Sequence, residues 1–134
     1  MPEKRPLHIL TPTEVRSLID QCSRRAPTGA RDAALIAALY RGGLRISEAL
    51  ALHARDLNGE RGTLRVHNGK GHKPRTVGLD ATAFGLIDRW RDVKADLGLD
   101  PRTTPLFCTL RGGVIAVNNI RRHAQAASGE GRHQ

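Results

Sequence analysis

Cysteine, aromatic residues and acidic residues are all scarce in this chain. Cys22 and Cys108 are the only cysteines and lie far apart, without partners at metal-ligand spacing, so we expect two reduced thiols rather than a disulfide framework or a zinc site. Aromatic residues make up only 3% of the sequence, which leaves Ala, Leu, Ile and Val to fill the core of a helix-rich fold. Because 13 acidic residues face 22 Lys and Arg, the formal net charge is +9, and polyanions are the expected partners.

Long apolar runs are also missing. No segment approaches the roughly 18 apolar residues of a membrane-spanning helix, and the first six residues lack the apolar stretch of a signal peptide. These absences favour the cytoplasm. A length of 134 residues suits one domain, for which we expect a linker or disordered arm at residues 1–9, a folded part at residues 10–127 and a frayed tail at residues 128–134.

The basic residues gather in two zones. Five Lys or Arg and no acid lie between Arg61 and Leu79, and five Arg face the single acid Glu130 between Pro101 and Gln134. Such zones favour nucleic acid as the partner. Charge alone leaves anionic membranes, ribosomal RNA and acidic proteins as alternatives.

The first third of the chain carries the signals of three helices. Thr11 and Glu14 form a capping-box pattern for a helix from Pro12 to about Arg24. A helix from Ala30 to Arg41 is apolar nearly all round, which is typical of a central core helix, and two glycines end it. A third helix is expected to begin near Ile46 or Ser47.

A change of period marks the middle of the chain. Residues 63–67 and 75–79 alternate as antiparallel strands do, and the glycine-rich segment between them presents Lys70. Asp80 is a predicted N-cap. Two further helices are expected at residues 81–97 and 117–127, so the predicted fold class is helix-rich α+β with a small three-stranded antiparallel sheet.

Two cationic residues could carry chemistry. Arg45 follows the Gly42–Gly43 break as a buried-looking arginine, and Lys70 lies 25 positions later in the hairpin. A guanidinium fork and a movable ammonium group together can grip a phosphodiester. From the residues alone, an exposed ion pair between Arg45 and Glu48 and a solvated basic hairpin explain the same pattern.

The order of the segments adds specificity. The opening Leu10–Glu14, the run Leu39–Glu48, the hairpin Gly69–Arg75 and the short Pro105–Phe107 occur in the order found in tyrosine recombinases, or phage integrases, and the chain resembles that family from Leu10 to about Ala127. Each segment is common alone, whereas the ordered set is specific. The resemblance implies the N-terminal portion of a catalytic domain that cuts and rejoins double-stranded DNA without metal or nucleotide cofactor.

The resemblance also implies roles for individual residues. Arg45 matches the arginine that clamps the scissile phosphate, and Glu48 matches the acid that supports it, so we expect Glu48 to orient the guanidinium of Arg45. Lys70 matches the hairpin lysine that resembles a general acid for the leaving hydroxyl. We assign contacts with the DNA backbone to the remaining basic residues His72, Lys73, Arg75, Arg121 and Arg122.

The second half of such an active site is not identifiable in the sequence. The family carries a His-x-x-Arg motif, a later His or Trp and a tyrosine nucleophile, whereas the only tyrosine here, Tyr40, lies in the core-like helix and is expected to pack there with its hydroxyl satisfied. We therefore expect a truncated catalytic domain that binds DNA but does not cleave it alone, and that self-associates or contacts an intact recombinase.

Alternatives from other classes remain open. One is a catalytically silent module that binds DNA or a partner protein, and another is a basic ribosome-associated protein. The nucleotide sequence beyond codon 134 distinguishes the silent module from a truncated catalytic domain. A shifted reading frame that encodes His-x-x-Arg and a late tyrosine would support truncation. Metal chemistry is disfavoured because His53, His67 and His72 lack zinc-like spacing, and the segment around Lys70 lacks the pattern of a P-loop.

Overall fold

The computed structural model describes residues 11–67 and 73–116. Three helices come first, namely α1 (Pro12–Gln21), α2 (Pro27–Arg41) and α3 (Ile46–Leu50). A short 3₁₀ helix η2 (Ala54–Asp56) leads into the strands β1 (Leu57–Asn58), β2 (Thr63–Val66) and β3 (Arg75–Gly78), and α4 (Ala81–Asp96) follows. The predicted α+β class with a three-stranded sheet is confirmed. The expected arm at residues 1–9, the helix at 117–127 and the tail at 128–134 lie outside the described residues.

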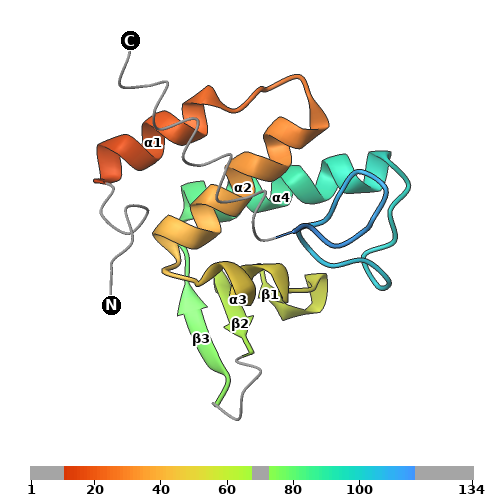
Figure 1. Cartoon of the computed structure of the whole chain (residues 1–134). Coiled ribbons are helices and arrows are strands. Elements are labelled where there is room, and N and C mark those ends of the chain that lie inside the picture. The colour runs from red at the N-terminus through yellow and green to blue at the C-terminus, as the bar shows by residue number, and fades with distance from the viewer. Residues whose placement is uncertain (1–10, 68–72, 117–134) are drawn as a thin grey trace.

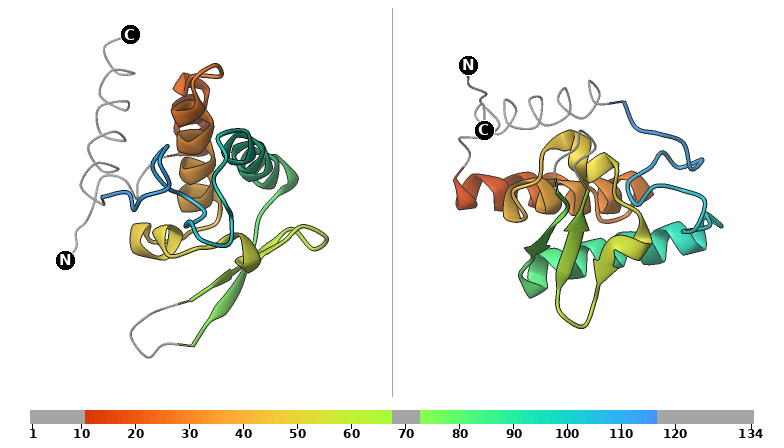
Figure 2. Two further views of the ribbon diagram at one scale, coloured as in Figure 1. Left: turned by 90° about the vertical axis from the view of Figure 1, so that its right-hand side faces the viewer. Right: turned by 90° about the horizontal axis from the view of Figure 1, so that it is seen from below.

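The helices form a layer from which the sheet projects. Helix α2 packs against both α1 and α4, and α3 contacts α2 on the side of the sheet (Figure 1). The strand order is β1-β2-β3 with antiparallel pairing, and the last pair toward residue 68 is Val66 with Arg75. Figure 2 shows that the β2–β3 ribbon points away from the helices.

The core is centred on α2, as its apolar sequence predicts. Ala34, Ala37 and Ala38 are fully buried on this helix. Aromatic side chains, although few, fill the core beside α2. Trp90 is 0% exposed and donates its indole N–H to the carbonyl of Leu106 at 2.7 Å. Small residues on α2 thus allow close helix packing, and one large side chain closes the core.

The predicted starts of α1, α3 and α4 are confirmed, whereas the end of α1 and the start of α2 differ from the prediction. Thr11 and Glu14 form the reciprocal capping box, with donor–acceptor distances of 2.9 and 3.1 Å. Helix α1 ends at Gln21 rather than near Arg24 because Cys22 is already extended. Helix α2 begins at Pro27, three residues before the prediction, with proline in the first turn, where its missing N–H costs nothing.

The turn between α2 and α3 sets the position of Arg45. Gly42 keeps a right-handed conformation, and Gly43 takes a φ of 69°, a region that favours glycine. The chain then reverses into α3, with Arg45 as its extended N-cap residue.

The third strand lies where the alternating pattern had placed none. Residues 57–58 form β1 on the edge of the sheet. Residues 105–108 form no strand and are held by side chains of α4, since Lys94 donates to the carbonyl of Pro105 at 2.7 Å. Within the two described ranges, no helix is both long and apolar enough to cross a membrane.

Candidate functional site

Arg45 is exposed rather than buried. Its backbone N–H donates to Oε1 of Glu48 at 2.9 Å, which fixes the start of α3. Within residues 11–67 and 73–116, the guanidinium of Arg45 makes no ion pair with a carboxylate. The N–H donors of the guanidinium therefore face solvent, while Glu48 holds the main chain of Arg45 in place.

Glu48 is the buried acid beneath this turn, and its side chain is only 6% exposed. The carboxylate accepts two hydrogen bonds from the guanidinium of Arg75, at 2.8 and 3.1 Å. The hydrogen bonds from Arg75 are the main cause that lowers the pKa of Glu48 below its ordinary value. Glu48 thus hydrogen-bonds to the guanidinium of Arg75, and its hydrogen bond to Arg45 is made with the backbone N–H.

The inward direction of Arg75 explains this difference from the expected pairing. Arg75 stands opposite the buried Val66 in the sheet, so both side chains leave the ribbon on the face toward the helices. A signal for this was present in the sequence, because Arg75 has the same parity as the apolar Val77 and Leu79. The long side chain crosses the gap to α3 and keeps 44% of its surface exposed.

A second buried acid, Asp56, repeats the arrangement of Glu48 nearby. Its Oδ2 accepts the backbone N–H of His53 at 2.9 Å, and its Oδ1 lies 2.9 Å from Nε2 of His67. The carboxyl side chain is 6% exposed, whereas the imidazole of His67 is 54% exposed. The spacing of both histidines was interpreted only with respect to metal binding, so the Asp56–His67 pair was not predicted.

The structure brings three of the predicted site residues together, Arg45, Glu48 and Arg75. Lys73 is exposed just before β3. Four predicted residues lie outside the described part of the chain, namely Lys70, His72, Arg121 and Arg122.

Tyr40 and the two cysteines do not have the environment of nucleophiles. Tyr40 is half-buried on α2, and burial raises its pKa to about 12. Its hydroxyl, expected to be satisfied, forms no hydrogen bond with another described residue. Burial also raises the pKa of Cys22 to about 11 and raises the pKa of the fully buried Cys108. The raised pKa values keep these groups protonated near neutral pH.

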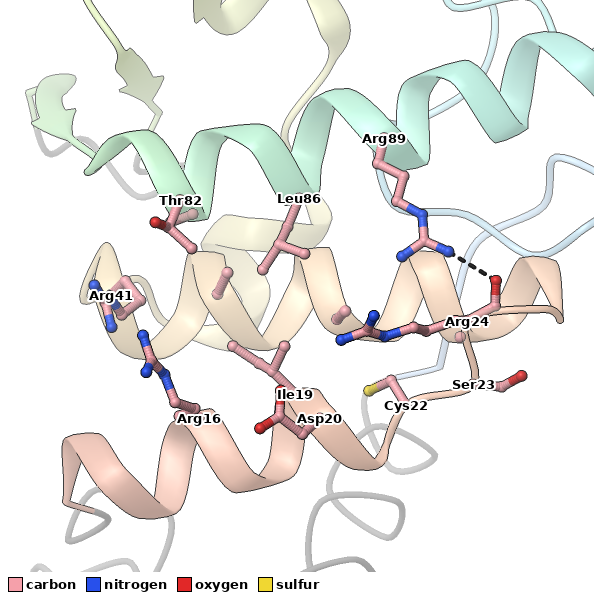
Figure 3. A pocket seen from close by; sticks show the side chains of 14 residues that line it. Arg16, Ile19, Asp20, Cys22, Ser23, Arg24, Arg41, Thr82, Leu86 and Arg89 are labelled. Carbon is pink, nitrogen blue, oxygen red and sulfur yellow. Dashed lines mark hydrogen bonds between the residues drawn. The ribbon is translucent and has the colours of Figure 1, made fainter.

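A cavity of about 320 Å³ opens between α1, α2 and α4 (Figure 3). Apolar side chains such as Ile19 and Leu86 line it together with four arginines, Arg16, Arg24, Arg41 and Arg89. Arg41 pairs with Asp80, and Arg89 donates to the carbonyl of Arg24 at 2.7 Å. Arg45, Glu48 and Arg75 do not line this cavity, so it is separate from the candidate site. No group of three His, Cys, Asp or Glu suited to a metal ion occurs among the described residues.

Comparison with solved structures defines the class of fold. The chain superposes on XerA recombinase with a TM-score of 0.77 and 23% identity, covering 96% of this chain and 44% of XerA. It also matches the XerH site-specific recombinase bound to its difH substrate in a pre-cleavage complex, with a TM-score of 0.72 and 27% identity over 94% of this chain and 38% of XerH. Over the matched part, the fold is that of these two recombinases.

Sequence comparison then gives the family. The model of the Phage integrase family matches residues 8–132, and the chain belongs to this family. A similar relative is tyrosine recombinase XerD of Ralstonia nicotianae, which is 36% identical over 123 residues, covering 88% of this chain and 40% of that protein. The chain thus spans about two fifths of the length of this relative.

Proposed function

We propose that this chain binds the phosphodiester backbone of double-stranded DNA as the N-terminal part of a tyrosine-recombinase catalytic site. The observation that carries the proposal is the exposed guanidinium of Arg45 on a turn whose backbone is fixed by the buried Glu48. An arginine held in this way can offer paired donors to phosphate oxygens without losing them to a protein carboxylate.

The comparisons and the charge support DNA as the partner. XerH, one of the structural neighbours, was solved bound to a DNA substrate. The net charge of +9 and the basic zone from Arg61 to Leu79 supply long-range attraction for a polyanion. We place this activity in the cytoplasm, where the chain would meet DNA.

The proposal gives each candidate site residue a role that suits the chemistry of its side chain. Arg45 grips the phosphate, and Glu48 supports the site through the main chain of Arg45 and the side chain of Arg75. Lys70 supplies a mobile charge and a proton to the leaving hydroxyl. Secondary contacts with the DNA backbone are assigned to His72, Lys73, Arg75, Arg121 and Arg122.

A salt titration tests this grip. Binding of the chain to a fluorescent duplex should weaken linearly on a log–log plot, with a slope of about −0.9 for each phosphate neutralised. Arg45→Ala and Lys70→Ala should each reduce the magnitude of the slope by about 0.9. Arg16→Ala removes another exposed positive charge, one that lines the cavity, and is the matched control.

The outcomes separate specific from generic binding. If Arg16→Ala and Arg45→Ala reduced the magnitude of the salt slope equally, the chain would attract DNA only through its net charge. Absence of salt-dependent binding at low ionic strength would refute the proposal altogether.

We further propose that the chain alone does not cleave DNA. The pKa of about 12 for Tyr40 leaves its hydroxyl protonated, and its ring is half-buried on α2. Incubation with a nicked suicide duplex should therefore yield no covalent protein–DNA complex in a denaturing gel. A covalent band that disappears in Tyr40→Phe would contradict this.

A further inference from the structure

Small residues of α2 leave the cavity between α1, α2 and α4 open. Ala33 and Ala37 line it, so at these two positions α2 sends no long side chain into the space beside its neighbours. In Figure 3, Ile19 of α1 and Leu86 of α4 point toward α2 from its two sides. The three helices therefore give the cavity an apolar lining that a ligand can contact.

Positive charge dominates the polar part of the same lining. Four arginines contribute guanidiniums, whereas Asp20 contributes the one carboxylate among the lining residues. Arg41 pairs with Asp80, and within the two described ranges neither Arg24 nor Arg89 forms an ion pair with a carboxylate. Like charges gathered in this way repel one another, so an anion that binds beside them relieves the repulsion.

Arg89 is already oriented for such a contact. Its side chain reaches from α4 to the segment after α1, where it donates one N–H to the carbonyl of Arg24 at 2.7 Å (Figure 3). A guanidinium has five N–H donors, so four remain for a ligand. Because the bond to the main chain already restricts this exposed side chain, less conformational entropy is lost when an anion binds.

An apolar lining combined with arginines selects the chemistry of the ligand. A guanidinium can bind a carboxylate through two parallel hydrogen bonds, and the cavity gains from burial of an apolar side chain. Its volume of about 320 Å³ lies at the lower end of the roughly 300–1,000 Å³ typical of ligand pockets, which suits a side chain better than a large cofactor. A DNA backbone supplies anions but no apolar group to bury.

We propose that this cavity is a docking site for an acidic peptide segment of a partner protein. An apolar side chain of the peptide enters beside Ile19 and Leu86, and its carboxylates bind the guanidiniums of Arg24 and Arg89. A central apolar anchor with polar contacts around it is a common arrangement in protein recognition. The inference goes beyond DNA binding and does not depend on it.

Two probe peptides test the apolar part of the site on the unaltered protein. One is a fluorescent peptide with a central leucine among glutamates, and the other carries serine in place of the leucine. Fluorescence anisotropy should show saturable binding of the leucine peptide and about tenfold weaker binding of the serine peptide, because the serine buries no comparable apolar area. Equal affinity for both peptides would refute insertion into the cavity, and no binding of the leucine peptide would refute the docking site.

A matched pair of substitutions on α4 tests the charged part. Arg89→Glu reverses a charge that lines the cavity, whereas Arg91→Glu makes the same change two positions away at an exposed residue that does not line it. Arg89→Glu should weaken binding of the leucine peptide by about tenfold, and Arg91→Glu by less than about twofold, because salt screens charges outside the contact. Equal losses in the two variants would contradict the proposal.

A second substitution covers the case in which Arg89→Glu does not fold. Arg24 is exposed between α1 and α2, and Arg24→Glu should reduce peptide affinity as Arg89→Glu does. Thermal melts identify a variant that has lost its fold. Wild-type affinity in a folded Arg24→Glu chain would count against the proposed contact.

A duplex titration distinguishes failure of this inference from failure of the proposed function. Arg89→Glu and Arg91→Glu should lower affinity for a fluorescent duplex equally, because neither residue belongs to the candidate DNA site. A larger loss in Arg89→Glu, together with equal affinity for the two peptides, would mean that the cavity arginines contact DNA and would overturn the docking site. Selective binding of the leucine peptide by a chain that does not bind the duplex would support the docking site and refute only the proposed function.

Discussion

Glu48 shows at the scale of single residues how a buried acid can be stable in this fold. A carboxylate that is 6% exposed loses most of its hydration, and this cost is offset by two hydrogen bonds from Arg75 and one from the N–H of Arg45. Arg75 keeps nearly half of its surface in water and so loses less hydration than the acid does. The pair is therefore sensitive to removal of the arginine, which would leave a buried charge without a partner.

The lowered pKa of Glu48 predicts a pH dependence of stability. The folded state binds the carboxyl proton less tightly than the unfolded state does, so the stabilisation is complete above the unfolded pKa and is lost as pH falls through the folded pKa. Urea unfolding at a series of pH values should show wild type losing more stability in acid than Glu48→Gln, which lacks this carboxylate. Glu60→Gln changes an exposed turn residue and is the matched control.

Equal acid sensitivity in wild type and Glu48→Gln would contradict this. That result would mean that Arg75 stabilises the unfolded chain as much as the folded one, or that other carboxylates dominate acid unfolding.

At the scale of elements, local signals predicted helix starts better than contacts between elements. Thr11 and Asp80 could be identified because an N-cap acts on backbone groups within three residues. The strand β1 was not located in the sequence because it is defined by its pairing with β2, a contact between elements. The candidate site was likewise predicted only in part. The order of the sequence segments identified Arg45 and Glu48, but Arg75, the partner of Glu48, lies 27 residues away in the chain. Only the position of Arg75 on the same strand face as apolar residues could have suggested this partner.

Asp80 caps α4 and also binds Arg41 of α2. Substitution of Asp80 should therefore destabilise the protein measurably. Its Oδ1 accepts the N–H of Ala83 at 2.7 Å, and its Oδ2 accepts Nε of Arg41 at 2.8 Å. Asp80→Ala removes the cap of α4 and should lower the free energy of unfolding by about 1–2 kcal/mol in urea titrations. Asp88→Ala removes an exposed acid paired with Arg91 on the same helix and should cost less than about 0.5 kcal/mol.

Similar losses in Asp80→Ala and Asp88→Ala would contradict the prediction. They would show that α4 is held by its buried face, with Trp90 and Ile87, rather than by its N-terminus.

The whole molecule combines a high positive charge with limited apolar exposure. Among the described residues, the large apolar side chains that are exposed are Leu97, Leu110 and Val114, and Val114 is 79% exposed. Charge repulsion keeps copies apart at low salt, whereas apolar contacts gain from screening of that charge. DNA binding and self-association should therefore respond to salt in opposite directions.

This contrast gives a prediction for the expected self-association. Sedimentation velocity should show a monomer at low ionic strength and a growing fraction of larger species as salt rises, over the range in which duplex binding is lost. Val114→Ser removes the most exposed large apolar side chain and should shift association to higher protein concentration. Leu97→Ser is a control with less exposed area, 40%, so its effect should be smaller. A monomer at every salt and protein concentration would refute self-association, and association that is strongest at low salt would assign it to charge pairing instead of apolar contact.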